Sequence, residues 1–124
     1  MPAKTETTIM LVDDDKITNF VNERYIKKYD PNIKVSSFMI AREALHALIN
    51  EEKPDVIFLD INMPEMDGWE FLNECTILKI SSKVFMLSSS IDTSDIDRAK
   101  QYALVSDFIS KPLSVEKLQT ALAN

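Results

Sequence analysis

Two runs of four apolar residues constrain most strongly what this 124-residue chain can fold into. Val56-Ile57-Phe58-Leu59 and Val84-Phe85-Met86-Leu87 contain no alternating polar positions, so each is expected to form a strand that is buried on both faces. Sheets that are covered on both faces are built almost only from parallel strands joined by helices. The two runs therefore predict an α/β fold.

Helical patterns separate these two strands from three further strand-like segments. The additional strands are expected near residues 8–12, 33–37 and 108–109, and the second of them alternates apolar and polar residues, as a half-exposed edge strand would. Five βα units of this kind predict a doubly wound (βα)5 flavodoxin-like sandwich. Its five-stranded parallel sheet is expected to have the strand order 2-1-3-4-5.

The helical patterns also predict which side chains are buried. In the first helix, with Asp15 or Thr18 as N-cap, the expected buried stripe is Ile17, Phe20, Val21 and Tyr25. His46 falls off the apolar stripe of its helix and is expected to be exposed, whereas Cys75 falls on a stripe and is expected to be buried. Trp69 begins the third helix and is expected to be partly exposed near the acidic residues.

Length and composition limit the class of protein. The length fits one domain, residues 1–124, with residues 1–6 as a flexible N-terminal tail. The net charge of −6 disfavours direct contact with nucleic acid or an anionic membrane, because their phosphates would face a like-charged surface. No apolar segment is long enough to cross a bilayer, and a single cysteine excludes an internal disulfide. We therefore expect a cytoplasmic protein.

Acidic side chains follow two of the predicted strands. Asp13 and Asp14 come directly after the first strand, and Asp60 ends the third. In the strand order 2-1-3-4-5 the carboxyl ends of these strands meet at the switch point of the sheet, where ligands bind. Crowded carboxylates repel one another unless a cation lies between them, and ligands that are all oxygen favour Mg²⁺ (or Mn²⁺). Asp15, the third acid of the run, is expected to cap the helix.

Asp60 could act at such a site as a nucleophile that accepts a phosphoryl group and forms an aspartyl phosphate. Catalysis of phosphoryl transfer depends mainly on positioned positive charges and hydrogen-bond donors. Lys111, after the last strand, can supply a charge, and Ser88, after the fourth strand, can supply a hydroxyl. Ser88 could also be simply a polar strand end, because the serines that follow it blur the register of the motif.

These motifs together resemble the receiver domain of two-component response regulators, the CheY-like family. They are Asp13-Asp14, Asp60 with Met63-Pro64 and Asp67-Gly68 behind it, Ser88-Ser89, and Lys111-Pro112. The resemblance covers essentially the whole chain. It implies a phosphoacceptor that receives its phosphoryl group from a histidine kinase or a histidine phosphotransfer domain. It also implies a downstream protein target that binds the face built by the fourth helix, the fifth strand and the fifth helix.

The resemblance assigns roles to individual residues. It makes Asp60 the phosphoacceptor and a metal ligand, Asp14 a direct Mg²⁺ ligand, and Asp13 a ligand that acts largely through water. The backbone carbonyl of Asn62 matches the remaining protein ligand. Lys111 matches the lysine that pairs first with the acceptor and then with the phosphoryl group.

Switching residues are implied in the same way. Ser88 matches the switch hydroxyl, and Phe108 matches the aromatic side chain that turns inward with it. Asn62 and Ser90 occupy positions that tune dephosphorylation in receivers, and the Lys111-Pro112 bond is expected to be cis. Receivers commonly carry a glycine before the last strand, where this chain has Leu104-Val105, so the fourth helix is expected to end differently here.

Several functions compete at this stage. The chain stops shortly after the last helical stripe, so we expect a stand-alone receiver without an output domain; a piece of a larger regulator or hybrid kinase is the alternative. We do not expect a turnover enzyme. An aspartate-nucleophile phosphohydrolase commonly has a second carboxylate two residues after the nucleophile, where this chain has Asn62. A non-phosphorylated pseudo-receiver usually lacks one of the acidic residues that this chain retains.

Overall fold

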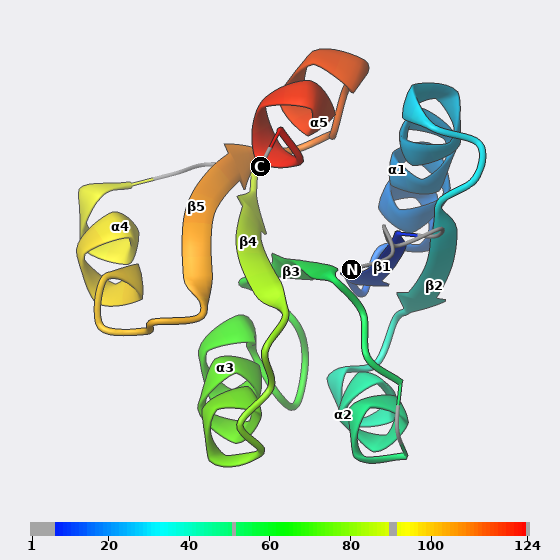
Figure 1. The fold of residues 1–124 in the computed structure, drawn as a ribbon. Coiled ribbons are helices and arrows are strands. Elements are labelled where there is room, and N and C mark those ends of the chain that lie inside the picture. Colours follow the sequence, from blue (N-terminus) through cyan, green and yellow to red (C-terminus); the bar gives the residue numbers. More distant parts are fainter. Residues whose placement is uncertain (1–6, 51, 90–91, 124) are drawn as a thin grey trace, which may run out of the picture.

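A computed structural model describes residues 7–50, 52–89 and 92–123, and these residues alternate strictly between strands and helices (Figure 1). The strands are β1 (Thr8–Val12), β2 (Lys34–Phe38), β3 (Val56–Asp60), β4 (Lys83–Ser88) and β5 (Val105–Ser110). The helices are α1 (Lys16–Tyr29), α2 (Ala41–Ile49), α3 (Gly68–Ile77), α4 (Thr93–Ala99) and α5 (Val115–Ala121). The tail expected at residues 1–6 and the expected tuning residue Ser90 lie outside the described residues.

All neighbouring strands of the sheet pair in parallel, in the order β2-β1-β3-β4-β5. This confirms the predicted doubly wound fold and places the switch point between β1 and β3. Every residue of β3 is buried, whereas β2 at the edge is only partly covered, as its alternating sequence predicted. The last strand is longer than the two residues that the sequence indicated, because β5 continues pairing with β4 through residues that are not apolar.

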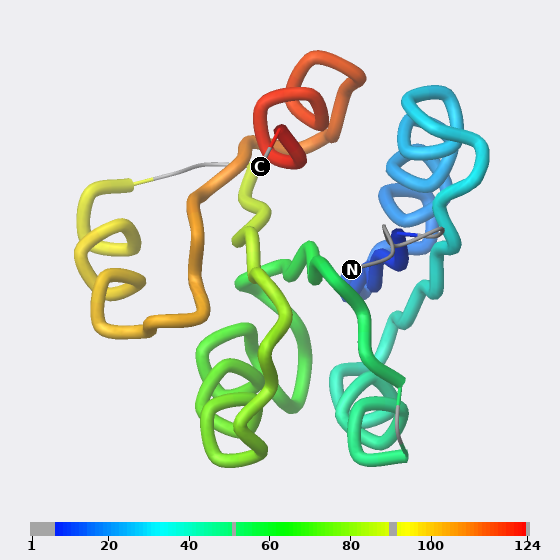
Figure 2. The backbone as a smooth tube through the Cα atoms, viewed as in Figure 1, coloured from blue at the N-terminus to red at the C-terminus, as the bar shows by residue number. Residues whose placement is uncertain are grey.

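The helices cover both faces of the sheet (Figure 1). Helices α1 and α5 lie on one face and pack over a core cluster that includes Ile26, Phe58 and Leu118. Helices α2 and α3 lie on the other face over a second cluster that includes Leu45 and Leu72. Helix α4 lies beside the β5 edge, and the tube view shows the chain returning from it directly into β5 (Figure 2). The two clusters are the reason that β1, β3 and β4 are apolar on both sides.

The α1 stripe predicted from the sequence is wrong at its first two positions, whereas Val21 and Tyr25 are half-buried and Tyr25 packs against the core cluster. Ile17 and Phe20 are 73% and 61% exposed, and the buried residues of α1 are instead Asn19, Asn22 and Ile26. Ile26 sits over the core cluster, and residues four and seven positions before it share its face of the helix. Asn19 and Asn22 hydrogen-bond the backbone of the loops after β1 and β5, and Ile17 and Phe20 face solvent.

Of the other three side chains whose exposure was predicted, two lie as predicted and one does not. His46 is exposed and Cys75 is buried, as predicted. Trp69 is only 4% exposed, so its predicted partial exposure is wrong. Its ring stacks on Tyr102 with 5.8 Å between ring centroids, and the Arg98 guanidinium carbon lies 4.6 Å from the Trp69 ring centroid. Two side chains from α4 and the turn after it therefore cover the indole.

Helix α4 ends without a left-handed residue. The C-cap Lys100 keeps right-handed dihedral angles, φ −61° and ψ −18°, and the next residues continue as tight turns into β5. This confirms that the helix closes differently from a glycine-terminated one. Within the described part of the chain, no helix has the length and apolar character required to span a bilayer.

Candidate phosphoacceptor site

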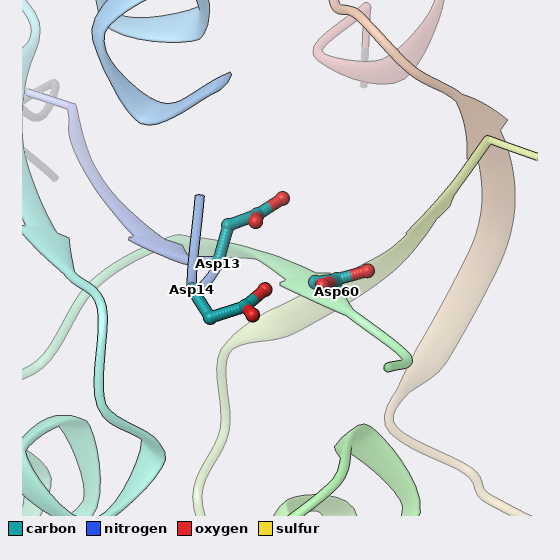
Figure 3. A group of neighbouring side chains, drawn as sticks. All are labelled: Asp13, Asp14 and Asp60. Atoms are coloured by element: carbon teal, nitrogen blue, oxygen red, sulfur yellow. The ribbon is translucent and has the colours of Figure 1, made fainter. Parts of the chain in front are cut away.

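The register of the sheet brings the predicted site residues to one edge. Val12 pairs with Leu59, so Asp13 and Asp60 follow at the same level of neighbouring strands. Asp60 pairs in turn with Leu87, directly before Ser88. Figure 3 shows Asp13 and Asp14 projecting from the end of β1 beside Asp60 at the end of β3. The convergence expected from the strand order is therefore present.

The three acids form one cluster. One carboxylate oxygen from each of Asp13, Asp14 and Asp60 lies within 4.8 Å of the others. Asp13 and Asp60 are almost fully buried, at 1% and 4% exposure, whereas Asp14 is exposed. Buried carboxylates are costly unless they are paired or bind a cation, so the two inner acids need positive charge close by.

Lys111 supplies part of that charge. Its Nζ lies 2.8 Å from Asp13 Oδ2 and 2.9 Å from Asp60 Oδ1. The Lys111-Pro112 bond is cis, as expected, and the backbone N–H of Lys111 donates to the carbonyl of Ser88 at 2.9 Å. The lysine is thus fixed at its backbone by β4 and reaches both buried acids with its side chain.

Burial and charge act in opposite directions on the titration of this cluster. Burial raises the pKa of Asp60 to about 6, even though the hydrogen bond from Lys111 lowers it; the negative charge of Asp13 adds to the rise. Burial also disfavours the charged form of Lys111, but its hydrogen bonds to Asp13 and Asp60 outweigh that effect, and its pKa is raised. The lysine is therefore protonated at neutral pH, where Asp60 is largely ionised.

The cluster has the donor set of a hard divalent cation. One ammonium group among three carboxylates leaves an excess of negative charge, and the exposed Asp14 lies on the solvent side of the buried pair. Oxygen ligands alone, with an open side for water, suit Mg²⁺ better than zinc or a soft metal. Asp13, Asp14 and Asp60 thus fit a magnesium site.

The start of α3 packs tightly against the acceptor strand. Gly68 donates its N–H to the carbonyl of Ile61 at 2.8 Å, and a Cβ at this position would lie 2.7 Å from the carbonyl oxygen of Asp60. Only a residue without a side chain fits there. Asp67 and Glu70 form a reciprocal capping box in the same turn, which fixes the helix start.

The remaining predicted residues occupy positions around this cluster. Ser88 is buried, at 6% exposure, and ends β4 at the same edge of the sheet. Asn62 is exposed, and its N–H donates to Asp60 Oδ1 at 3.4 Å. Phe108 is partly buried against the core cluster on the α2 and α3 face. Ser88 and Asn62 therefore lie at the ends of the strands that carry the site, and the roles expected for all three residues stay predictions.

Sequence reasoning missed Asn19 and Asn22. Asn19 Nδ2 donates to the carbonyl of Asp13 at 2.9 Å, and Asn22 Oδ1 accepts from the N–H of Leu113 at 2.9 Å. Both amides are buried, at 5% and 0% exposure. The signal that could have identified them is their spacing with Ile26, which places all three on one helical face.

The chain belongs to the response regulator receiver domain family, whose family model matches residues 9–123. The fold and the acidic site define the class: a CheY-like receiver of two-component systems. Receivers of this family are signalling modules that bind Mg²⁺ at an acidic pocket, and response regulators interact with histidine kinases and with downstream targets.

Three relatives illustrate the similarity. The chain is 32% identical over 120 residues to the probable C4-dicarboxylate response regulator DctR of Bacillus subtilis, covering 97% of this chain and 52% of DctR. It is 38% identical over 96 residues to the chemotaxis protein CheY of Listeria monocytogenes, covering 73% of this chain and 79% of CheY. The crystal structure of a two component response regulator from Cytophaga hutchinsonii matches with TM-score 0.86 and 30% identity, covering 98% and 96% of the two chains. This chain thus spans about half the length of DctR.

Proposed function

We propose that this chain accepts a phosphoryl group on Asp60 from a phosphohistidine donor, with Mg²⁺ (or Mn²⁺) bound by the acidic cluster, and is not a turnover enzyme. The observation that carries the proposal is the position of Lys111 Nζ, 2.8 Å from Asp13 and 2.9 Å from Asp60 at the carboxyl ends of β1 and β3. A fixed cation beside a buried carboxylate is what phosphoryl transfer requires, because the transferred group carries spread negative charge.

The proposed transfer balances without a further reactant. Lys111 and the N–H of Asn62 both contact Asp60 Oδ1, so we assign bond formation to Oδ2 of the same carboxylate. The bond from oxygen to phosphorus forms as the bond from phosphorus to the donor's imidazole nitrogen breaks, and the imidazole leaves with its electron pair and takes a proton from solvent water. Asp13, Asp14, Asp60 and the carbonyl of Asn62 would hold a Mg²⁺ ion. The bound ion would supply positive charge to the phosphoryl oxygens.

The donor is proposed to dock on the exposed start of α1. Ile17 and Phe20 are 73% and 61% exposed, and α1 begins directly after the loop that carries Asp13 and Asp14. Exposed apolar side chains beside a polar site are typical of a protein-binding surface. A histidine kinase or histidine phosphotransfer domain fits this position, because its histidine must reach Asp60. We also propose a cytoplasmic location for the chain, as expected from its composition.

Phosphorylation is proposed to shift a two-state equilibrium on the face of α4, β5 and α5. Ser88 would hydrogen-bond the phosphoryl group, and Phe108 would pack further inward. Helix α4 suits such a change because Ala99 is its only buried residue among those described. A downstream protein would read the altered face; Asn62 and Ser90 are proposed to set how long the phosphoryl group persists.

Intact-mass measurement tests the acceptor. With Mg²⁺ and acetyl phosphate, the wild-type chain is expected to gain one phosphoryl mass, and Asp60→Asn is expected to gain none. No added mass on the wild type, or equal gain by Asp60→Asn, would exclude the proposal. Sustained hydrolysis of a phosphomonoester would favour a phosphohydrolase, and an unmodified but folded wild type would favour a pseudo-receiver.

A second experiment tests the docking surface. Phe20→Asp is expected to slow phosphoryl transfer from a phosphohistidine protein while leaving phosphorylation by acetyl phosphate unchanged. Ile49→Asp, on an exposed residue at the end of α2, is the matched control because it places the same charge at the other helix layer. Equal transfer rates for the two variants would argue against docking on α1.

A further inference from the structure

The first two turns of α1 bury polar side chains and expose apolar ones. Asn19 and Asn22 are buried, while Ile17 and Phe20 on the same turns face solvent. Burying an amide has a free-energy cost unless its hydrogen bonds are made. Among the described residues, Asn19 Oδ1 and Asn22 Nδ2 have no hydrogen-bond partner, so each amide uses only one end. Simple packing would be served better by an aliphatic side chain.

The bonds that the two amides do make reach two loops: the acidic loop, which carries Asp13 and Asp14, and the lysine loop, which runs from Lys111 to Leu113. Asn19 Nδ2 donates to the carbonyl of Asp13 at 2.9 Å and lies 3.5 Å from the carbonyl of Phe38. Asn22 Oδ1 accepts from the N–H of Leu113 at 2.9 Å, two residues after Lys111. The two amides are one helical turn apart, so one rigid helix holds both loops.

The lysine loop has a second backbone contact on the opposite side. The N–H of Lys111 donates to the carbonyl of Ser88, and the N–H of Leu113 donates to Asn22. The segment from Lys111 to Leu113 is therefore held between β4 and α1. Its side chain at Lys111 reaches Asp13, whose own backbone is held by Asn19.

We propose that Asn19 and Asn22 are positioning residues for phosphoryl transfer, with Asn22 fixing the Lys111 loop and Asn19 fixing the Asp13 loop relative to the same helix. This inference rests on the proposed function. Neither amide contacts the reacting atoms. Each sets the position of a charged group through the backbone, and misplacing such a group by about 1 Å can slow a reaction by about a hundredfold.

The two positions should therefore have different phenotypes. Asn22→Leu keeps the number and branching of the side-chain heavy atoms but removes the acceptor for Leu113, so the phosphorylation rate with acetyl phosphate at saturating Mg²⁺ is expected to fall about tenfold. The Mg²⁺ concentration that gives half the maximal rate should stay unchanged. Asn19→Leu is expected to raise that concentration about tenfold, because the loop that carries Asp13 loses its support. A purely structural role would affect both measurements alike.

A matched control separates positioning from stability. Ile26→Val truncates the third buried residue of the same face, which bonds to neither loop, and its loss of stability can be compared with that of Asn22→Leu by urea denaturation. Ile26→Val is expected to phosphorylate within about twofold of wild type. If Asn22→Leu does not fold, Asn22→Ser serves instead, because its hydroxyl ends one bond short of the Oδ1 position.

Hydrogen exchange supplies a readout that needs neither metal nor phosphoryl donor. The Leu113 amide is expected to exchange at least about tenfold faster in Asn22→Leu than in wild type or Ile26→Val. Faster exchange with an unchanged phosphorylation rate would overturn the positioning role, and so would an equal rate loss in Ile26→Val. A wild-type chain that takes up no phosphoryl group would refute the proposed function instead, while the exchange result would still report whether the loop is held.

Discussion

Replacing Asp60 with asparagine should stabilise the protein, and by an amount that grows with pH. Burial raises the pKa of Asp60 to about 6 from its ordinary value of 3.8. The folded protein therefore binds this proton more tightly than the unfolded chain does. The stability that Asp60 contributes is fully present below pH 3.8 and is lost as the pH rises through 6. Asparagine does not ionise, so the variant escapes this loss.

The two pKa values set the magnitude. Their separation corresponds to about 3 kcal/mol once Asp60 is fully ionised, and about 1 kcal/mol of that is already lost near pH 4.5. The advantage of Asp60→Asn over wild type should therefore increase by about 2 kcal/mol between about pH 4.5 and pH 8. Lys111 keeps Asp13 as a partner at 2.8 Å in the variant, so no unpaired charge is created.

Urea denaturation of both proteins at the two pH values, with a chelator present, measures this increase. Comparing the proteins at each pH cancels every titration that they share, and any pH-independent effect of the substitution also drops out. A stability difference that changes by less than about 0.5 kcal/mol, or that shrinks as the pH rises, would refute the reasoning from burial.

Three further predictions follow from particular contacts. Gly68→Ala should lower the free energy of unfolding by about 1–2 kcal/mol, because a Cβ placed 2.7 Å from a backbone oxygen forces a shift that helix propensity only partly offsets; an unchanged urea midpoint would contradict this. Arg98→Ala should shift the emission of Trp69, the only tryptophan, to longer wavelength and cost about 0.5–1 kcal/mol, whereas an unchanged spectrum would mean that the guanidinium does not cover the ring. Burial, with the nearby Glu74 charge, raises the pKa of Cys75 to about 12, so a thiol reagent at pH 8 should label only unfolded protein; labelling faster than unfolding would show access to the native thiol.

The sheet and the acidic site could be predicted from sequence because each depends on local patterns that topology then combines. The run from Val56 to Leu59 fixes a doubly buried strand, and parallel pairing brings whatever follows it to the same edge as Asp13. Turn chemistry served equally well, since Asp15 caps the first helix as predicted, accepting from the N–H groups of Ile17 and Thr18.

Helix orientation could not be predicted from the same patterns. Apolar spacing identified α1 but wrongly included Ile17 and Phe20, because the buried positions in its first turns are the polar Asn19 and Asn22, which an apolar pattern does not reveal. Trp69 was misplaced for a related reason: its cover comes from Arg98 and Tyr102, which lie far away in the sequence. Contacts of that kind leave no periodic signal in a single sequence.

The single glycine of the chain gives an unusual map of mutational tolerance. Gly68 does not have a positive φ angle and is required for space, whereas Glu65 and Lys79 have φ angles of 66° and 58°, which favour glycine or asparagine. A library of variants should therefore be depleted of every substitution at Gly68 yet enriched for glycine and asparagine at the other two positions. For anyone engineering this domain, stability is to be gained at Lys79, after the end of α3, while Gly68 behind Asp60 should be left unchanged.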